Sequence, residues 1–338
     1  MATYKRQRYL LMTLDPAHIG TGGYRLGRVD NSIVREPGTR IPKIPGTSLH
    51  GAVRSYAAQL YETPEAAGQS HDNVADPDKN PVCYTFGYIK KKQKGDETKA
   101  YSGVVNIFDA HVVLFPVYSM AGPIWVSTPE RLIDAGFTFE AEDKRKLSDM
   151  LDPGAAMLTW DREDALNLGW LMVTVVGKVT TKAPGQWQND QRWKIIKDKI
   201  AIVNDTLFSH IVNSNLEVRT SVAIDPERGA AEDKALFTYE ALPRATFLTA
   251  EVMLDDYRET WPLTEDSQSK TAKNNELPGN AKWSGPLDVV RDGLRMIEWL
   301  GVGGMGTRGF GRVAIVGEAI EEEYGIDSQH QKIAQEVQ

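Results

Sequence analysis

One aspartate, Asp30, lies in a loop-forming stretch that is otherwise rich in basic residues, glycine and proline. The stretch, residues 27–54, reads GRVDNSIVREPGTRIPKIPGTSLHGAVR. A carboxylate in this setting can hold a magnesium ion against a bound phosphodiester, or it can orient an attacking hydroxyl group. It can equally be an Asx-turn residue, which loops commonly contain. The local pattern leaves both interpretations open.

Other titratable side chains outside the predicted helices are further candidates for acid–base chemistry. They are His18, Asp109, His111 and Glu240. A lone histidine after a strand is more often structural than catalytic. The sequence shows no Ser/His/Asp arrangement and no paired-histidine metal motif, and its one cysteine, Cys83, excludes an internal disulfide and a cysteine-built zinc site.

A glycine-rich loop lies near the other end of the chain, at residues 301–311, GVGGMGTRGFG. Glycines let backbone amides cradle an anion, and Arg308 and Arg312 add positive charge. The loop is not a nucleotide-binding P-loop, because it follows a predicted helix and lacks the Gly-Lys-Ser/Thr ending. A tight turn between a helix and a strand explains the same glycines, so both interpretations stay open.

The sequence PGTSLHGAVR predicts a second anion site at a helix start. Thr47 or Ser48 would cap the helix, and His50 and Arg54 lie in its first turns. A plain capped helix is the alternative. Together with the arginines of residues 25–40 and the glycine-rich loop, the pattern suggests a surface that follows a polyanionic backbone, as in RNA or single-stranded DNA recognition.

The apolar patterns predict the elements that must position these loops. We expect a buried strand at 7–14, a helix from Pro45-Gly46 onward, one or two strands at 103–118, helices within 127–168, one long helix at 192–212, a β-hairpin at 214–243 and a helix at 286–300. Residues 63–101 are polar and are expected to be a surface insertion, mostly loop. Without repeats or an obvious linker, residues 1–320 are predicted to be one elaborated α+β domain, followed by an acidic tail at 321–338.

Charge is distributed unevenly along the 338 residues, whose formal net charge is −7. The first 54 residues hold nine lysines and arginines against three acids, whereas the C-terminal end is acidic. The composition is that of an ordinary folded protein, with 41% hydrophobic and 25% charged residues. No apolar run approaches the roughly 20 residues of a membrane span, and no signal sequence is evident, so a cytoplasmic protein is expected.

Four blocks of this sequence resemble the repeated backbone subunit of type III CRISPR effector complexes, a member of the RAMP superfamily. Residues 16–56 carry His-x-Gly-x-Gly, Val-Asp-x-x-Ile-x-Arg-Glu and Pro-Gly-x-Ser-Leu-x-Gly-x-x-Arg. FDAHVVLFPVYSMAGPIWVSTP and the hairpin LEVRTSVAIDPERGAAEDKALFTYEALP are similar to the Cmr branch. GVGGMGTRGFGRV is closer to the Csm branch. The Cmr branch is favoured.

The resemblance implies a modified ferredoxin-like (RRM-type) core with an inserted thumb hairpin, and it makes Asp30 the required catalytic residue and metal ligand. Such subunits form a filament with other copies and other type III subunits on a CRISPR guide RNA. They cut complementary target RNA with a divalent metal, Mg²⁺ or Mn²⁺, leaving 2′,3′-cyclic phosphate and 5′-hydroxyl ends. His18 and Glu240 take accessory catalytic places. The implied RNA-binding residues are Arg25, Arg28, Arg35, Thr47, Ser48, His50, Arg54, Arg219, Gly303, Gly304, Thr307, Arg308, Gly309 and Phe310.

This chain departs from the family pattern at two positions. His50 stands where the family usually has lysine, which predicts a weaker or pH-dependent guide contact. Tyr118 stands where an arginine is typical. Two alternatives remain for the function: a scaffold that binds guide RNA without cutting, and a guide-processing endoribonuclease that needs no metal.

Overall fold

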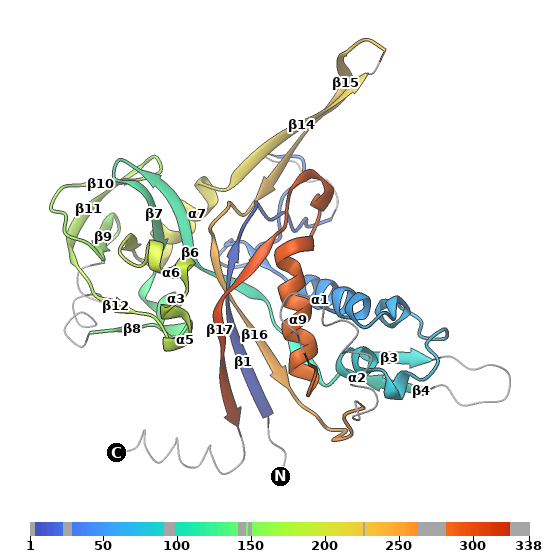
Figure 1. Ribbon diagram of the computed structural model, residues 1–338. Helices are drawn as coiled ribbons and strands as arrows, with labels where there is room; N and C mark the ends of the chain where they lie inside the picture. The colour runs from blue at the N-terminus through green and yellow to red at the C-terminus, as the bar shows by residue number, and fades with distance from the viewer. Residues whose placement is uncertain are drawn as a thin grey trace, which may run out of the picture.

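The computed structural model describes residues 4–22, 29–90, 99–140, 147, 151–225, 227–262 and 282–324. A large mixed sheet runs through the molecule, in the strand order β10-β11-β9-β13-β7-β6-β16-β1-β17, with β2 added to β6 and β5 to β16 (Figure 1). Its strands are β1 (Tyr4–Thr13), β2 (Lys43–Ile44), β5 (Val105–Ile107), β6 (Ala110–Ser119), β7 (Gly122–Ser127), β9 (Ala155–Leu158), β10 (Leu166–Leu168), β11 (Leu171–Lys178), β13 (Ile200–Ile202), β16 (Phe247–Leu254) and β17 (Val313–Tyr324).

Three smaller two-stranded sheets and several short helices complete the described part of the chain. The sheets pair β3 (Gly87–Lys90) with β4 (Lys99–Ser102), β8 (Thr138–Phe139) with β12 (Thr181–Lys182), and β14 (Glu217–Asp225) with β15 (Ala230–Ala241). The helices are α1 (Gly46–Leu60), α2 (Pro81–Phe86), α3 (Pro129–Asp134), α5 (Gly185–Gln188), α6 (Gln191–Ile196), α7 (Asp205–Ser214) and α9 (Pro286–Leu300), with 3-10 turns η1 (Pro64–Ala67), η2 (Pro77–Lys79) and η3 (Gly306–Arg308). None of these described helices is long and apolar enough to cross a membrane.

Strand β1 is buried on both faces because its side chains alternate between two hydrophobic cores. Tyr9 and Leu11 face the core that also holds Val53 of α1 and Val289 of α9. Leu10 faces the second core, which includes Trp187 and Phe247. The buried first strand predicted at 7–14 is therefore confirmed, and it lies in the sheet between β16 and β17.

The α+β class is confirmed. Reduced to the four strands β6-β16-β1-β17 and the two helices that pack against each other beside them, the chain runs β1-α1-β6-β16-α9-β17. This is the β-α-β-β-α-β element order of a ferredoxin-like core. The hairpin β14-β15 enters between α7 and β16 and projects away from the body of the molecule (Figure 1).

The single helix predicted at 192–212 is wrong. The segment instead forms α6, then strand β13 between β7 and β9, then α7. Asp190 and Asn204 each cap a new helix with a side-chain oxygen, and Ile200 and Ile202 are fully buried in the sheet. The described residues of 127–168, where helices were predicted, hold the helix α3, one further helical residue at 147, and the strands β8, β9 and β10.

Residues 63–101 were predicted to be mostly loop, and this fails for 81–90, which form α2 and β3, whereas 64–80 are mainly loop with the turns η1 and η2. The side chains of Val82, Tyr84 and Phe86 on α2 are buried in the main core. Asn80 caps this helix by accepting hydrogen bonds from two backbone N–H groups. The basic part of the predicted insertion, 91–98, lies outside the described residues, as does 325–338 of the predicted tail, whereas 321–324 belong to β17.

Candidate functional site

Two loops that are distant in the sequence meet the base of the hairpin at strand β15. The segment around His18 pairs with Gly304 of the glycine-rich loop, and Ala17 pairs with Leu242 just after β15. Asn31 pairs with Tyr239 in a parallel bridge, so the Asp30 loop runs beside β15. The structure thus brings three of the sequence-predicted blocks together at one place.

Asp30 is exposed at this junction and is held by one residue of the hairpin, Thr238. Oδ2 of Asp30 accepts hydrogen bonds from the Thr238 backbone N–H at 2.8 Å and from its Oγ1 at 2.9 Å. The second carboxylate oxygen, Oδ1, accepts no hydrogen bond from another described residue. The hydrogen bonds from the Thr238 backbone and then its side chain lower the pKa of the Asp30 carboxyl. A carboxylate that stays ionised is better suited to holding a cation or orienting a hydroxyl group than to taking up a proton.

Glu240 is a brace rather than a free carboxylate. Its Oε1 lies 2.6 Å from Nη2 of Arg35, and its Oε2 accepts a hydrogen bond from the Ile33 N–H at 3.3 Å. Arg35 also donates to Asn213 and to the Ile33 carbonyl, and both side chains of the ion pair are little exposed, at 13% and 12%. Arg35, predicted to bind RNA, therefore has its guanidinium bound within the fold.

His18 is buried behind the Asp30 loop, 8% exposed. Its Nδ1 lies 2.7 Å from the Glu240 carbonyl oxygen and must donate to it, because a carbonyl only accepts. In the neutral ring, Nε2 is then the nitrogen with a free lone pair. An added Cβ at Gly20 would lie 3.1 Å from this Nε2, so the glycine leaves room beside it.

The glycine-rich loop is attached to the other face of the hairpin by arginine–aromatic contacts. Nη1 of Arg308 donates to the Tyr239 hydroxyl at 2.7 Å, and the Arg219 guanidinium lies 4.8 Å from the centre of the Phe310 ring. Gly303 has a φ of +88°, and an added Cβ there would come within 2.6 Å of the His18 carbonyl oxygen, so only glycine fits.

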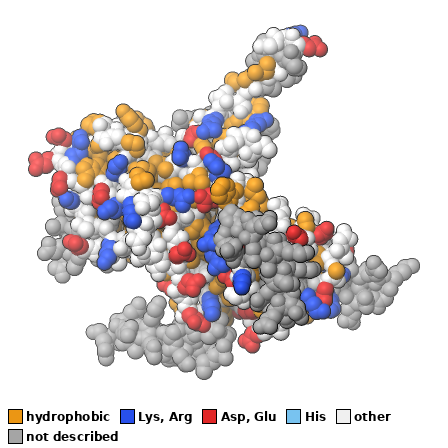
Figure 2. Space-filling model, viewed as in Figure 1, with side chains coloured by type: hydrophobic (Ala, Val, Ile, Leu, Met, Phe, Trp, Pro, Cys, Tyr) orange, Lys and Arg blue, Asp and Glu red, His pale blue; other side chains and the backbone are white. Residues whose placement is uncertain are grey.

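Most of the predicted contacts on this loop are open to solvent. The exposed residues are Gly303, Gly304, Thr307, Arg308 and Gly309. Phe310 is only 5% exposed, and its ring packs against the Arg219 guanidinium. The ring is therefore not available for stacking with an RNA base. Figure 2 shows Lys and Arg side chains at the base of the projecting hairpin and hydrophobic side chains along its length.

The start of α1 differs from the expected anion site. Pro45 occupies the N-cap position with no side-chain cap, and Thr47 and Ser48 lie inside the helix. Oδ1 of Asp109 accepts a hydrogen bond from the Gly46 N–H at 2.7 Å, and Lys43 pairs with the same carboxylate. The chain's own carboxylate thus takes a place that was predicted for a phosphate.

His50 and Arg54 form contacts within the fold rather than with the hairpin region. The His50 ring packs edge-on against Phe86 at 5.1 Å, and burial lowers its pKa, with the Arg54 charge lowering it further. Arg54 donates to the carbonyl oxygens of Ala66 and Gly87, each at 2.9 Å, and contacts His71. Arg54 therefore fastens residues 64–90 to α1. Arg25 and Arg28 lie outside the described residues.

Comparison with known proteins assigns the family. Residues 10–314 match the RAMP superfamily. The chain belongs to the RAMP superfamily. Within this superfamily, it is 26% identical over 256 residues to the CRISPR system Cmr endoribonuclease Cmr4 of Pyrococcus furiosus, which covers 72% of this chain and 80% of that protein. It is 48% identical over 42 residues to the CRISPR system Cms endoribonuclease Csm3 of Mycobacterium tuberculosis, covering 12% and 18% of the two chains.

A solved structure shares the fold. A chain of the type III-B Cmr-beta complex bound to cognate target RNA, determined by cryo-electron microscopy, superposes with a TM-score of 0.59 at 15% identity, covering 93% of this chain and 96% of that one. The much longer sequence match to a Cmr protein than to a Csm protein supports the Cmr branch expected from the second block and the hairpin.

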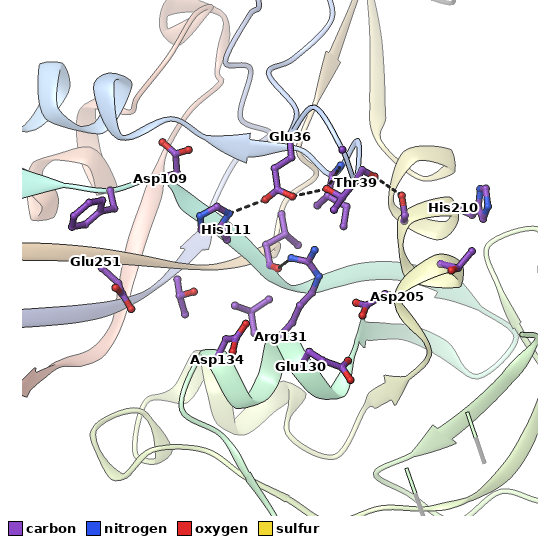
Figure 3. Close-up of a pocket in the computed structure, with 18 residues that line it drawn as sticks. Glu36, Thr39, Asp109, His111, Glu130, Arg131, Asp134, Asp205, His210 and Glu251 are labelled. Carbon is purple, nitrogen blue, oxygen red and sulfur yellow. Dashed lines mark hydrogen bonds and ion pairs between the residues drawn. The ribbon is translucent and has the colours of Figure 1, made fainter. Parts of the chain in front are cut away.

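This RAMP chain also has a separate pocket of about 920 Å³ that the sequence did not predict (Figure 3). The candidates His111 and Asp109 lie there rather than beside Asp30. Nδ1 of His111 lies 2.9 Å from Oε1 of Glu36, and Thr39 donates to Oε2 of Glu36 at 2.5 Å. The hydrogen bond with His111 is the main cause that lowers the pKa of Glu36 to about 2.

Sequence reasoning missed Thr238 and Tyr239, the two hairpin residues that hold Asp30 and Arg308. Both lie in the hairpin block that resembles the Cmr branch, but the resemblance assigned a role to neither of them. Their only signal is an alternation along β15, in which every second side chain faces the Asp30 loop. In the described part of the chain, no group of three or more His, Cys, Asp and Glu side chains is arranged to hold a metal by itself.

Proposed function

We propose that this chain is a backbone subunit of a type III CRISPR effector complex of the Cmr kind, which binds guide RNA and cuts complementary target RNA with Asp30 as its catalytic carboxylate. The similarity to a Cmr endoribonuclease over most of the chain supports the activity. The observation that carries the site is the exposed, ionised Asp30 beside the hairpin base, with one oxygen held and the other open.

The cut is a transesterification within the target strand. The 2′-hydroxyl next to the scissile phosphate attacks phosphorus, the bond to the 5′-oxygen of the next nucleotide breaks, and that oxygen leaves with a proton. The products are a 2′,3′-cyclic phosphate and a 5′-hydroxyl end. Oδ1 of Asp30 orients the reacting groups, which is the main task when the nucleophile belongs to the substrate. His18 Nε2 and the exposed side chains of Thr307 and Arg308 are the next groups able to contact the phosphate.

The residues fit a divalent cation that is shared with RNA. Mg²⁺ is usually held by one or two carboxylates together with substrate phosphates and waters, and Asp30 offers one such oxygen. The lack of a three-ligand cluster among the described residues is compatible with this kind of site. When bound, Mg²⁺ or Mn²⁺ would neutralise charge that develops on the phosphate.

The same proposal covers the partners. Arg219, Arg308 and the exposed glycines contact an RNA backbone, and other copies of the chain and other type III subunits complete the complex. A cytoplasmic location is proposed with it, in accordance with a single, buried and free cysteine, Cys83.

The test is product analysis with a reconstituted, guide-loaded complex. Complementary RNA labelled at one end should give fragments at regular spacing with 2′,3′-cyclic phosphate ends, and EDTA should abolish them. Binding of target without any cut would favour the non-catalytic scaffold. Cleavage of a precursor repeat by the isolated chain in EDTA would favour the guide-processing alternative.

A further inference from the structure

We propose that Thr238 is a positioning residue for cleavage: it fastens the Asp30 carboxylate to the hairpin β14-β15, so that Asp30 is correctly placed only while β15 is correctly seated. This inference rests on the proposed function and names a residue to which the family resemblance assigned no role.

The contact between the two residues is reciprocal. The Thr238 hydroxyl accepts a hydrogen bond from the Asp30 N–H at 3.0 Å and donates its own hydrogen to Asp30 Oδ2, while the Thr238 N–H donates to the same oxygen. Both the main chain and the side chain of Asp30 are therefore fixed by one threonine. Since Oδ2 is occupied, the reaction is left with Oδ1.

The rest of the loop follows β15 like an added strand. The Asn31 N–H donates to the Thr238 carbonyl oxygen at 3.0 Å, and the Glu240 N–H donates to the Asn31 carbonyl oxygen at 3.0 Å. A shift of β15 would therefore carry the loop with it. The hydroxyl of Thr238 adds the one side-chain link that sets the carboxylate itself rather than the backbone.

The two faces of the hairpin separate the contact with Asp30 from the contact with the glycine-rich loop. Thr238 lies directly opposite Thr220 on β14, and the next outward pair on the same face is Val222 and Leu236, which are 42% and 65% exposed. Tyr239 points to the opposite face and contacts Arg308. The face that holds Asp30 is thus continuous with the exposed apolar face of the hairpin, and a ligand that moves this face also moves Asp30.

The experiment compares Thr238→Val and Thr238→Ser in the guide-loaded complex, with Thr220→Val as the matched control. Thr220 is exposed, and its side-chain hydroxyl forms no hydrogen bond with another described residue, so its substitution changes the same chemical group across the same hairpin. Guide binding, target affinity, melting temperature and the single-turnover cleavage rate at saturating target are measured for each complex.

We expect Thr238→Val to lower the saturated rate about tenfold, because it removes one hydrogen bond to a charged group, without changing target affinity or melting temperature. Thr238→Ser should restore the rate to within about twofold, and Thr220→Val should leave it unchanged. If Thr238→Val impairs assembly, Thr238→Ala removes the same hydroxyl in a smaller side chain and serves the same comparison.

Other outcomes separate the two proposals. A wild-type complex that does not cut overturns the proposed function and this inference with it. A wild-type complex that cuts, with Thr238→Val or Thr238→Ala equally fast, overturns only the role of Thr238. Loss of rate that serine fails to rescue, or that follows a loss of melting temperature, assigns Thr238 a structural role and also overturns positioning.

Discussion

Asp30 and Glu240 are both carboxylates at the base of the hairpin, yet their surroundings give them different tasks. Asp30 is exposed and bound on one oxygen only. Glu240 has both oxygens engaged, one by the Arg35 guanidinium and one by a backbone amide. Because its two oxygens are engaged and its side chain is little exposed, Glu240 is less available to a substrate than Asp30, so we assign Glu240 to the fold and propose Asp30 for the chemistry.

This difference predicts that Glu240→Gln lowers the free energy of unfolding and does not abolish cleavage. Removing one charge of a largely buried ion pair leaves Arg35 without its counter-ion, and we expect a loss of about 2 kcal/mol in the free energy of unfolding. Chemical denaturation of the full chain measures it, with Glu217→Gln as control, because the Glu217–Arg219 pair is more exposed and should change stability by less than about 0.5 kcal/mol.

A double variant sharpens the same prediction. Arg35→Met combined with Glu240→Gln should be less destabilising than the sum of the two single changes, because neither charge is then left alone. If the two losses of stability simply added, the proposed stabilising role of the Arg35–Glu240 ion pair would be contradicted. If Glu240→Gln abolished cleavage while the free energy of unfolding stayed unchanged, Glu240 would be assigned a catalytic role instead.

At the scale of elements, α1 and α9 pack closely because of one glycine. An added Cβ at Gly293 of α9 would lie 2.5 Å from the Val53 carbonyl oxygen of α1 and 2.7 Å from its Cγ1. The two helices pack beside the strands that lead to the candidate site, so the distance between the helices affects the position of these strands and of the loops that follow them.

We therefore expect Gly293→Ala to lower the free energy of unfolding by about 1–3 kcal/mol, since the helices must move apart. Gly51→Ala on α1 is the matched control. A Cβ at Gly51 meets no atom within 4 Å, and the change should stabilise the chain by about 0.5–1 kcal/mol through helix propensity. Equal signs for the two variants, measured by urea denaturation, would contradict this account of the packing.

Elements with complete local signals were predictable from the sequence. The helix after Pro45-Gly46 and the hairpin at 214–243 combine a clear start or turn with the matching periodicity, and both are confirmed. Residues 192–212 failed because Ile200, buried in strand β13, and Val203, buried directly after it, happen to continue the spacing of the two short helices around them. Apolar spacing indicates which residues are buried, and burial alone does not distinguish one long helix from two short helices separated by a strand.

The site could be predicted only in part. Motifs singled out Asp30, His18 and the glycine-rich loop as candidates, and the structure places all three beside β15. Thr238 could not be recognised, because its contact with Asp30 joins residues 208 positions apart and leaves no local pattern. Arg35 and Arg54 were assigned to RNA from their charge, whereas their hydrogen bonds within the protein are visible only in the fold.

For the whole molecule, the large sheet brings together segments from both ends of the chain. The loop after β1, the end of β15 and the glycine-rich loop before β17 converge, whereas the whole chain has a formal net charge of −7. A negative total is therefore compatible with a local site that binds RNA, because association depends on the charge distribution near the ligand.

The most direct measurement is the single-turnover cleavage rate of the guide-loaded complex with Asp30→Asn, at saturating target RNA. Asparagine keeps the size and much of the hydrogen bonding to Thr238 but removes the charge. We predict a rate at least about 10²-fold below wild type, with unchanged guide and target binding, while Asp164→Asn, an exposed acid on a different loop, cuts normally. Cleavage by the Asp30→Asn complex within about threefold of the wild-type rate would contradict the central role of Asp30.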